Sequence, residues 1–514
     1  MEVKLLPEPL IEFANDFLCE DPKKGISSMG FFSLSNNSHK SEISYAVIGS
    51  KKEIKKYKEW LGQFESFIES TSSGKALTVN HEIDDETGMI NELFGEEENT
   101  KEDFTEDAIN KKANPDFPGF NSDSCFKCKF INNSELDYLV PQKKIDDVLN
   151  SKKKKKELSD EIISIYKDAY SDLLEDSLTG KPDIIVIVIP DSVFKKVGNV
   201  KQVKGDINFR RKLKAEILGL GLNVPIQLIL ESTVDNTKKS IQDLSQIAWN
   251  YCIAQYYKTG NCIPWTIKDI DADTCYLGIS FNRVLDGENN RLQSSIAQAF
   301  NKGGKGLVFT GKQFEWRKEI AKVATPHLKY EYAKELIINV LSQYQKINKH
   351  TPKRVVIHKT SDFWDTYNHP DYNETGGLLD GIKELLGDET EVDLVSLKSS
   401  KIRMLRNGDY PVLRGSLFKL SDEVAILYTN GYIPYFNTYQ GAYTPAPLEI
   451  ENIGETPIDD IAKEILALTK MNFNNSDYCD GLPITIQFSS KVGEIIQYFP
   501  KDSVELPNKY YFYM

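Results

Sequence analysis

The sequence predicts an α/β fold with two domains, the first built around a parallel sheet. Residues 183–189 read D-I-I-V-I-V-I between two prolines, a continuous β-branched run typical of a strand that is buried on both faces. A basic helix from Asn208 and an apolar strand at 224–230 follow, which completes an α/β unit. Because the alternation of strands and helices begins again after Ile263, we place the domains at residues 1–264 and 265–514.

The remaining elements are predicted from hydrophobic patterning. Before the first buried run, the pattern indicates a strand at 43–48, a helix from Lys51 to about Ser70, and an amphipathic helix after Lys156. The second half of 208–265 reads as an amphipathic helix that ends at Gly260. Further on, strands are predicted at 274–281, 306–309, 354–358, 391–397 and 424–428, with helices at 330–345 and 457–469.

The composition is that of a globular protein without a membrane span. Hydrophobic residues make up 40 % of the 514 residues and charged residues 27 %, and no apolar run reaches the length of a transmembrane helix. The N-terminal residues lack the layout of a signal peptide, so we expect a cytoplasmic protein. The seven cysteines are an odd number and are widely spread, which favours reduced thiols. Cys125 and Cys128 form C-F-K-C without a second ligand pair, so structural thiols are favoured over a zinc site.

The charge is unevenly distributed. The net charge of −13 opposes general attraction to nucleic acid, but a dense acidic segment at about 82–107 carries much of it. We expect this segment to be a mobile loop or insertion. Five consecutive lysines at 152–156 are able to follow a nucleic-acid backbone, although a solvated helix start is the favoured interpretation.

A candidate phosphate site lies within residues 208–265. Arg210 and Lys214 are four residues apart and share a helix face, Gln227 lies on the next strand, and Asn250 and Lys258 share a face of the second helix. Such groups can converge on a terminal phosphate, which requires several donors and compensating charge. Spacing alone favours the alternative, a solvated basic helix beside a core helix.

This arrangement resembles the MID domain of Argonaute proteins, in which comparable residues hold the 5′ phosphate of a guide. Lys214, Gln227, Asn250 and Lys258 fall at matching places, Arg210 stands where the family usually has Tyr or His, and Ala254 stands where a basic residue is often found. The chain ends in N-K-Y-Y-F-Y-M. The resemblance implies that the carboxylate of Met514 folds into the pocket and, with Gln227, helps to hold a Mg²⁺ ion at the guide phosphate; an edge strand is the plainer interpretation of this tail, and the two are compatible.

The C-terminal half resembles the PIWI domain, which has an RNase H-like fold. Six landmarks occur in the family's order: C-Y-L-G-I-S-F, R-V-V-I-H-K-T-S, T-N-G-Y-I-P-Y-F, T-P-A-P-L, T-K-M-N-F-N-N and G-L-P-I-T-I-Q-F-S-S. Their sequence is more specific than any single one. The implied fold is therefore a Rossmann-like MID domain followed by an RNase H-like PIWI domain.

The resemblance also implies that the nuclease ligands are missing. RNase H chemistry needs clustered carboxylates to hold two Mg²⁺ ions. The positions that carry these ligands in active PIWI domains hold Ser280, Thr360 and Ser490 here. Glu315 is placed near the catalytic Glu, and a register shift would bring in Asp362 or Asp365. We expect a domain that binds a duplex without cutting it; the alternatives are an active RNase H-like guided endonuclease and a metabolic α/β protein that binds no nucleic acid.

The overall resemblance is to a short prokaryotic Argonaute. About 180 residues precede the first strong MID strand, too few for the N and PAZ domains of long Argonautes. The family implies a guide-binding subunit with a guide RNA, a complementary single-stranded DNA target from plasmid or phage, and an APAZ-containing effector partner. That effector is expected to be a TIR or sirtuin-like NADase, otherwise a nuclease, with assembly into a higher oligomer on activation.

Overall fold

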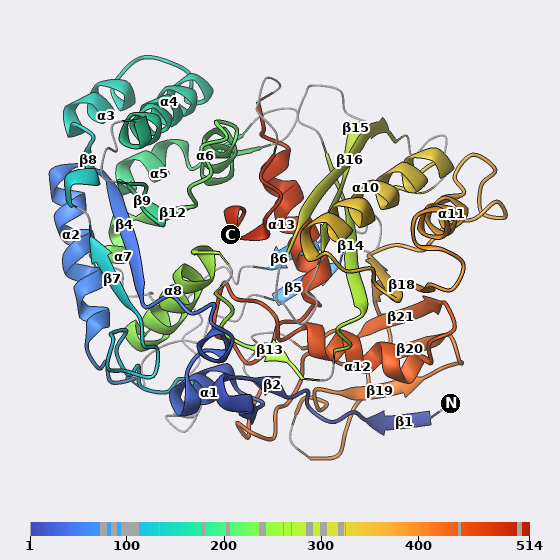
Figure 1. The fold of residues 1–514 in the computed structure, drawn as a ribbon. Helices are drawn as coiled ribbons and strands as arrows, with labels where there is room; N and C mark the ends of the chain where they lie inside the picture. Colours follow the sequence, from blue (N-terminus) through green and yellow to red (C-terminus); the bar gives the residue numbers. More distant parts are fainter. Residues whose placement is uncertain are drawn as a thin grey trace.

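Two large sheets dominate the described part of the chain (Figure 1). One cluster of buried apolar side chains extends between them. This computed structural model describes residues 2–514 except 72–79, 84–89, 94–112, 133, 176–179, 202–205, 236–242, 261, 269, 284–290, 299–305, 317–322, 324, 409, 440, 442–443 and 501–505. Among the described residues, no helix combines the length and the apolar character that crossing a bilayer requires.

The N-terminal sheet is parallel and covered on both faces. Its strands are β4 (Glu42–Gly49), β7 (Lys129–Asn132), β8 (Tyr138–Leu139), β9 (Ile184–Ile189) and β12 (Ile226–Leu230), in the order β12-β9-β4-β7 with β8 also beside β4. Alternate residues of β9 point to opposite faces: Ile185 and Ile187 pack into one buried cluster, whereas Val186 and Val188 pack into another. This two-sided burial explains the unbroken apolar run that predicted the strand.

Helices cover this sheet on both sides. They are α2 (Lys51–Gly62), α3 (Gln142–Leu149), α4 (Lys155–Glu175), α5 (Asp191–Val197), α6 (Phe209–Leu218), α7 (Glu231–Val234) and α8 (Leu244–Lys258). Lys155 begins α4 and Lys153 pairs with Glu161, so the lysine run is a solvated helix start. A short β10–β11 pair (Asn199–Val200 and Ile207–Asn208) precedes α6.

The C-terminal sheet has nine strands in the described part of the chain. Their order is β1-β19-β20-β21-β18-β17-β14-β15-β16. The strands are β1 (Glu2–Leu5), β14 (Thr274–Arg283), β15 (Arg291–Gln298), β16 (Val308–Glu315), β17 (Arg354–Lys359), β18 (Glu391–Ser399), β19 (Ser416–Lys419), β20 (Val424–Leu427) and β21 (Leu448–Ile453). Of these, β14, β17 and β18 are mutually parallel, so their carboxyl ends meet at one edge.

Two pairs of helices cover this second sheet. Helices α10 (Tyr330–Asn348) and α11 (Glu374–Leu386) pack with Leu277 and Ile357 on one face. Helices α12 (Ile458–Leu468) and α13 (Ile484–Ile496) pack with Tyr276 and Val356 on the other, in the cluster that extends into the N-terminal half. The shared core fixes the two halves against each other.

The first residues of the chain join the C-terminal half. Strand β1 pairs antiparallel with β19, with Glu2 opposite Lys419, although the sequence division places residues 1–264 together. A three-stranded sheet of β2 (Ile11–Glu12), β3 (Leu18–Cys19) and β13 (Thr266–Ile267) links the halves, next to α1 (Pro22–Met29). Part of the acidic segment is also ordered as a pair of strands, β5 (Asn80–Ile83) and β6 (Ile90–Leu93), whereas its residues 84–89 and 94–107 lie outside the described residues.

Candidate nucleic-acid interface

Lys214 lies in a buried position where the end of the chain meets helix α6. Asn208 caps this helix by accepting a hydrogen bond from the Arg211 amide at 3.1 Å, which sets the register that turns Lys214 inward. The Lys214 ammonium donates to the main-chain oxygen of Met514, and its side chain is only 9 % exposed. A buried ammonium with one acceptor retains donor capacity for a further anion.

The final residues are packed so that Met514 reaches this position. They form a short 3₁₀ helix, η6 (Tyr510–Phe512), preceded by a bridge between Lys509 and Leu307, and not an extended edge strand. Tyr510 and Phe512 are buried, and Tyr511 lies against Gly260 at the end of α8. In Figure 1 the C marker lies between α6, α8 and α13.

Gln227 and Lys258 form a second part of the same site. Gln227 Oε1 accepts from Lys258 Nζ at 2.5 Å and from Gln255 Nε2 at 3.0 Å. Lys258 also lies 3.5 Å from the Ile226 carbonyl and is 1 % exposed. The last turn of α8 therefore presents its lysine to the first two residues of β12, next to the glutamine that the sequence analysis grouped with it.

The electrostatics of the site are those of an anion receptor. Burial lowers the pKa of Lys214 well below its usual value, and the positive charges of Lys258, Arg210 and Lys491 lower it further. Burial, with the Arg210 guanidinium, lowers the pKa of Lys258 to about 7. The charges that act on both lysines are positive, so a bound anion would relieve repulsion and favour the charged ammonium groups. We call Arg210, Lys214, Gln227, Lys258 and Lys491 the cationic pocket.

Lys491 belongs to the pocket but was not predicted from the sequence. It lies on α13 in the C-terminal half, one residue after Ser490. Glu494, one turn further along α13, pairs with Arg211 of α6 at 2.6 Å. This ion pair holds the two helices together. Spacing within residues 208–265 carries no signal for a residue supplied by a distant helix.

Asn250 lies elsewhere. Its side-chain oxygen accepts from the Ser476 amide at 2.8 Å and from the Ser476 hydroxyl at 2.6 Å. Eight residues of α-helix span roughly 12 Å, so a residue on the same face as Lys258 is still two turns away. Asn250 thus fastens α8 to the C-terminal half. Arg210, on the first turn of α6, is the exposed member of the cationic pocket.

The oxygens predicted to hold Mg²⁺ are engaged by lysines. Gln227 Oε1 and the Met514 main-chain oxygen are hard donors of the kind Mg²⁺ accepts. However, each accepts a hydrogen bond from an ammonium group, Lys258 in one case and Lys214 in the other. Because both oxygens are already turned toward lysine ammonium groups, their arrangement does not fit a divalent ion, so we derive no step through Mg²⁺ and the ion remains a prediction.

The three positions compared with nuclease ligands lie at the carboxyl edge of the second sheet. Ser280 on β14 follows Ile279, which is paired with Lys359, and Thr360 follows Lys359 directly. Ser490 lies on α13, the helix that packs on β14 and β15. Ser280 and Thr360 are buried, with 7 % and 6 % exposure.

The three carboxylates considered as alternative nuclease ligands either bind other groups or lie exposed at the end of a strand. Asp362 pairs with Lys398 at 2.7 Å, and Asp365 accepts from the amides of its own turn. Glu315 is exposed near the end of β16. Within the residues that the structure describes, no three His, Cys, Asp or Glu side chains gather as metal ligands would.

We compared the sequence and the fold with known proteins. No protein-family model matches the sequence. The protein argonaute of Aquifex aeolicus (strain VF5) is 25 % identical over 275 residues, which cover 53 % of this chain and 34 % of that protein. Clostridium butyricum Argonaute, solved with a guide DNA and a 19-mer target DNA, matches with a TM-score of 0.58 at 18 % identity over 98 % of this chain and 54 % of that one. Drosophila Piwi matches with a TM-score of 0.59 at 12 % identity over 99 % and 56 %.

In fold, the chain is similar to Argonaute proteins. It spans about a third of the length of the curated Argonaute and little more than half of the solved ones. Because the structural match extends over nearly the whole chain, the predicted mixed α/β fold of MID and PIWI type is confirmed. We therefore call the half from β4 to α8 MID-like and the half from β14 to α13 PIWI-like.

A buried ion pair lies behind the edge of this Argonaute-like sheet. Lys359 donates to Glu374, whose Oε1 also lies 2.9 Å from His327 Nδ1. Burial and the charge of Lys359 lower the pKa of His327 to about 4, so its imidazole is neutral at pH 7. Burial acts to raise the pKa of Glu374, but Lys359 and His327 lower it to about 2. Lys359 thus forms an ion pair with Glu374 at the end of β17. Sequence spacing did not reveal this partner.

The seven cysteines are free thiols. All seven are unpaired, and burial raises the pKa of Cys125 to about 11. Cys128 is fully buried. Burial of Cys128 is compatible with the structural role that the sequence favours for the C-F-K-C motif, which stays a prediction.

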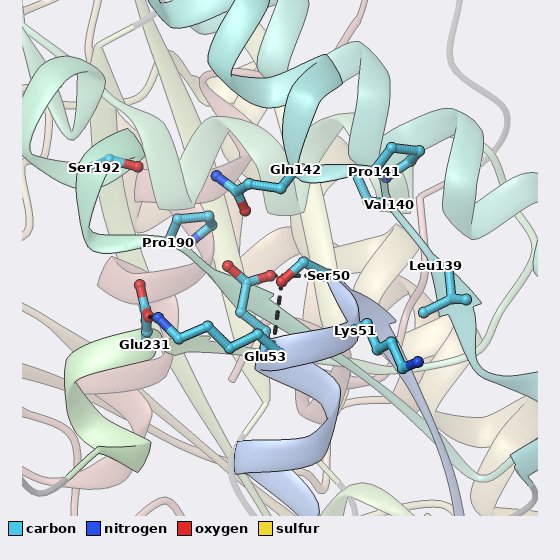
Figure 2. Close-up of a pocket in the computed structure, with 11 residues that line it drawn as sticks. Ser50, Lys51, Glu53, Leu139, Val140, Pro141, Gln142, Pro190, Ser192 and Glu231 are labelled. Carbon is cyan, nitrogen blue, oxygen red and sulfur yellow. Dashed lines mark hydrogen bonds and ion pairs between the residues drawn. The ribbon is translucent and has the colours of Figure 1, made fainter.

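A cavity of about 680 Å³ lies away from the cationic pocket (Figure 2). It opens at the carboxyl ends of β4, β9 and β12, between Ser50, Pro190 and Glu231. Its polar groups bind one another: Ser50 and Glu53 form the capping box of α2, and Lys52 pairs with Glu231 at 2.7 Å. None of the cationic-pocket residues lines it, and we assign it no ligand.

Proposed function

We propose that this chain binds the phosphorylated 5′ end of a small guide oligonucleotide in the cationic pocket. The observation that carries this proposal is the convergence of Lys214, Lys258 and Lys491 from α6, α8 and α13, whose charges repel one another around buried amide and carbonyl groups. A terminal phosphate supplies the negative charge and the acceptor oxygens that such a set lacks. The guide in the Clostridium butyricum Argonaute structure is DNA; we propose RNA here, as the resemblance implies.

The path of the guide beyond its phosphate follows α13. As the helix advances from Thr485 to Gly493, it moves along β14 from Gly278 to Asn282, and its next residue contacts α6. Helix α13 therefore connects the cationic pocket to the part of β14 nearest the carboxyl edge of β14, β17 and β18. A complementary single-stranded DNA paired with the guide would lie across this edge, where base pairing reads the sequence and the protein holds the backbone.

We also propose that the PIWI-like half binds this duplex without cleaving it. Two-metal hydrolysis needs carboxylates on both sides of the scissile phosphate. Ser280, Thr360 and Ser490 offer only hydroxyl groups, and neutral hydroxyls do not supply the charge that two divalent ions require.

The biological output would then come from a second protein. On the basis of the resemblance we propose an APAZ-containing effector, with a TIR or sirtuin-like NADase domain or otherwise a nuclease, that is activated when guide and target are bound. A target can bias an effector only through contacts that differ between two states. Co-expression with the product of the neighbouring reading frame, followed by an assay of NAD⁺ consumption with and without target, tests this proposal.

The decisive experiment compares guides with a 5′ phosphate and a 5′ hydroxyl. We expect Lys214→Ala to weaken binding of the phosphorylated guide by about 1–3 kcal/mol, and to leave the hydroxyl guide nearly unchanged. Lys212→Ala is a matched control, because Lys212 lies on the same helix but pairs with Asp160 at 2.5 Å. Equal losses for both guides in the Lys214 variant would refute the pocket.

A further inference from the structure

A short cationic and apolar segment follows β18. Residues 400–406 read S-K-I-R-M-L-R, with three cations and no acidic residue, in a chain whose net charge is −13. Leu405 is 90 % exposed and Ile402 is 45 % exposed. We call residues 400–406 the basic loop. A leucine so fully exposed between cations is unusual for a surface that contacts water alone.

The base of the basic loop is fastened to the sheet. The Met404 amide donates to the hydroxyl of the buried Tyr428 at 2.8 Å, and the Arg406 guanidinium lies over the Tyr432 ring at 4.4 Å from its centre. The Arg403 guanidinium donates to the Ser400 carbonyl. These contacts on both sides of Leu405 hold the backbone, so the leucine side chain projects from a fixed support.

The position of the basic loop follows from the strand directions. It begins where β18 ends, beside the end of β17, and the connection leads to the start of β19. Because β18, β21, β20 and β19 alternate in direction, the end of β18 and the start of β19 lie at the same edge. This is the edge that carries Ser280 and Thr360.

We propose that the basic loop binds the guide–target duplex, with Lys401, Arg403 and Arg406 near backbone phosphates and Leu405 inserted at a base step. The inference rests on the proposed function and adds a second contact to it. Phosphates match the sign of the loop's charge, and apolar side chains flanked by cations are a known means of opening a base step. An apolar patch for a protein partner would not require three cations around one leucine.

The test uses the full-length protein with a 5′-phosphorylated guide and DNA targets that carry 2-aminopurine at successive positions. Insertion of Leu405 predicts a rise in 2-aminopurine fluorescence at one step, and Leu405→Ala is expected to abolish that rise. We expect the variant to bind the target about threefold to tenfold more weakly. Val3→Ala is the matched control, because Val3 is 65 % exposed on β1, an edge strand outside the basic loop.

A second variant tests the cations separately. Arg403→Ala is expected to reduce the slope of log affinity against log salt concentration by about one, with the 2-aminopurine signal retained. The preference of the wild-type protein for a 5′-phosphorylated guide is measured in the same samples. If that preference is present while both variants behave as wild type, the basic-loop inference is wrong and the proposed function stands.

Other outcomes separate the two hypotheses as well. If the wild-type protein shows no preference for a 5′-phosphorylated over a 5′-hydroxyl guide, the proposed function itself is refuted. If Leu405→Ala leaves the fluorescence and the target affinity unchanged but weakens association with a co-expressed protein partner, the loop is a protein-binding surface and the inference is overturned.

Discussion

Lys258 shows how a single buried group controls the chemistry of the pocket. Its pKa is lowered to about 7 by burial and by Arg210, whereas a lysine in the unfolded chain has its ordinary value of 10.5. Between these two values the unfolded state binds more protons, so this group makes the empty protein more stable as the pH rises from 7. A bound phosphate favours the charged ammonium and raises the pKa again. We therefore expect phosphate binding above pH 7 to be coupled to proton uptake.

This coupling gives a pH prediction. The preference for a 5′-phosphorylated over a 5′-hydroxyl guide should be greatest near pH 7 and should fall as the pH rises to 9, by at most about tenfold per pH unit for one lysine. Lys258→Met should flatten the dependence, and Lys214, whose pKa is also lowered, should account for the remainder. Affinities measured at several pH values, with calorimetry in buffers of different ionisation enthalpy, check both points. A preference that is constant between pH 7 and 9 would contradict the prediction.

At the residue scale, the sequence identified the part of the pocket that lies within one continuous segment. Lys214, Gln227 and Lys258 converge because helix and strand periodicity fix which face each occupies. Asn250 was assigned to the site by the same periodicity. Sharing a helix face with Lys258 does not place it at the same level along the helix axis, and Asn250 binds Ser476 instead. Lys491 comes from a helix more than 200 residues later, so its approach depends on tertiary packing that no local pattern records.

Helix α13 is the element that connects the cationic pocket to the second sheet. A Cβ atom at Gly278 of β14 would lie 2.1 Å from the Thr485 carbonyl oxygen, so glycine allows the helix backbone to rest directly on the strand. The same helix carries Lys491 into the pocket. The close approach of α13 to Gly278 therefore helps to determine where Lys491 lies.

This link predicts that Gly278→Ala will harm both stability and guide binding. The added methyl group must push α13 away from β14, at a cost of about 1–3 kcal/mol, and Lys491 should move with the helix. Gly62→Ala is the control, because a Cβ atom there meets nothing within 4 Å and the residue has helical angles. We expect this control to be neutral or stabilising by up to about 1 kcal/mol. Urea unfolding midpoints and affinity for the phosphorylated guide measure the two effects, and equal behaviour of the two variants would disprove the link.

At the element scale, the sequence predicted the buried strands and missed elements whose local signals are weak. The unbroken apolar runs at β9 and β17 were sufficient to identify these strands. Helix α11 was missed because its T-G-G-L-L-D-G sequence has a low helix propensity. Its glycines serve packing on α10, since a Cβ atom at Gly377 would lie 2.3 Å from the Tyr330 carbonyl oxygen and one at Gly381 would lie 2.5 Å from Ile337. Polar β15 was missed for lack of an alternating pattern.

At the scale of the whole molecule, the first residues of the chain are joined to its last third. Lys4 pairs with Asp459 at 3.0 Å, and Glu8 lies between the buried Arg414 and Lys470, at 3.0 Å and 2.7 Å. The sequence could not reveal this arrangement, because a four-residue strand and one glutamate carry no information about a partner hundreds of residues away. The order of landmarks did reveal the fold of the C-terminal half, since long-range order is what distinguishes one α/β domain from another.

The cationic pocket and the hydroxyl side chains at the carboxyl edge of the second sheet together lead to a prediction about cleavage. A guide-loaded protein should bind a labelled complementary DNA in Mg²⁺ or Mn²⁺ and leave it intact, because Ser280, Thr360 and Ser490 cannot replace the carboxylates of a two-metal site. Target binding must be measured in the same reactions, so that an intact target is known to be an engaged one. Cleavage that disappears in Asp362→Ala or Asp365→Ala would show that one of these carboxylates enters the site when guide and target are bound, despite the ion pair of Asp362 with Lys398 and the turn closed by Asp365.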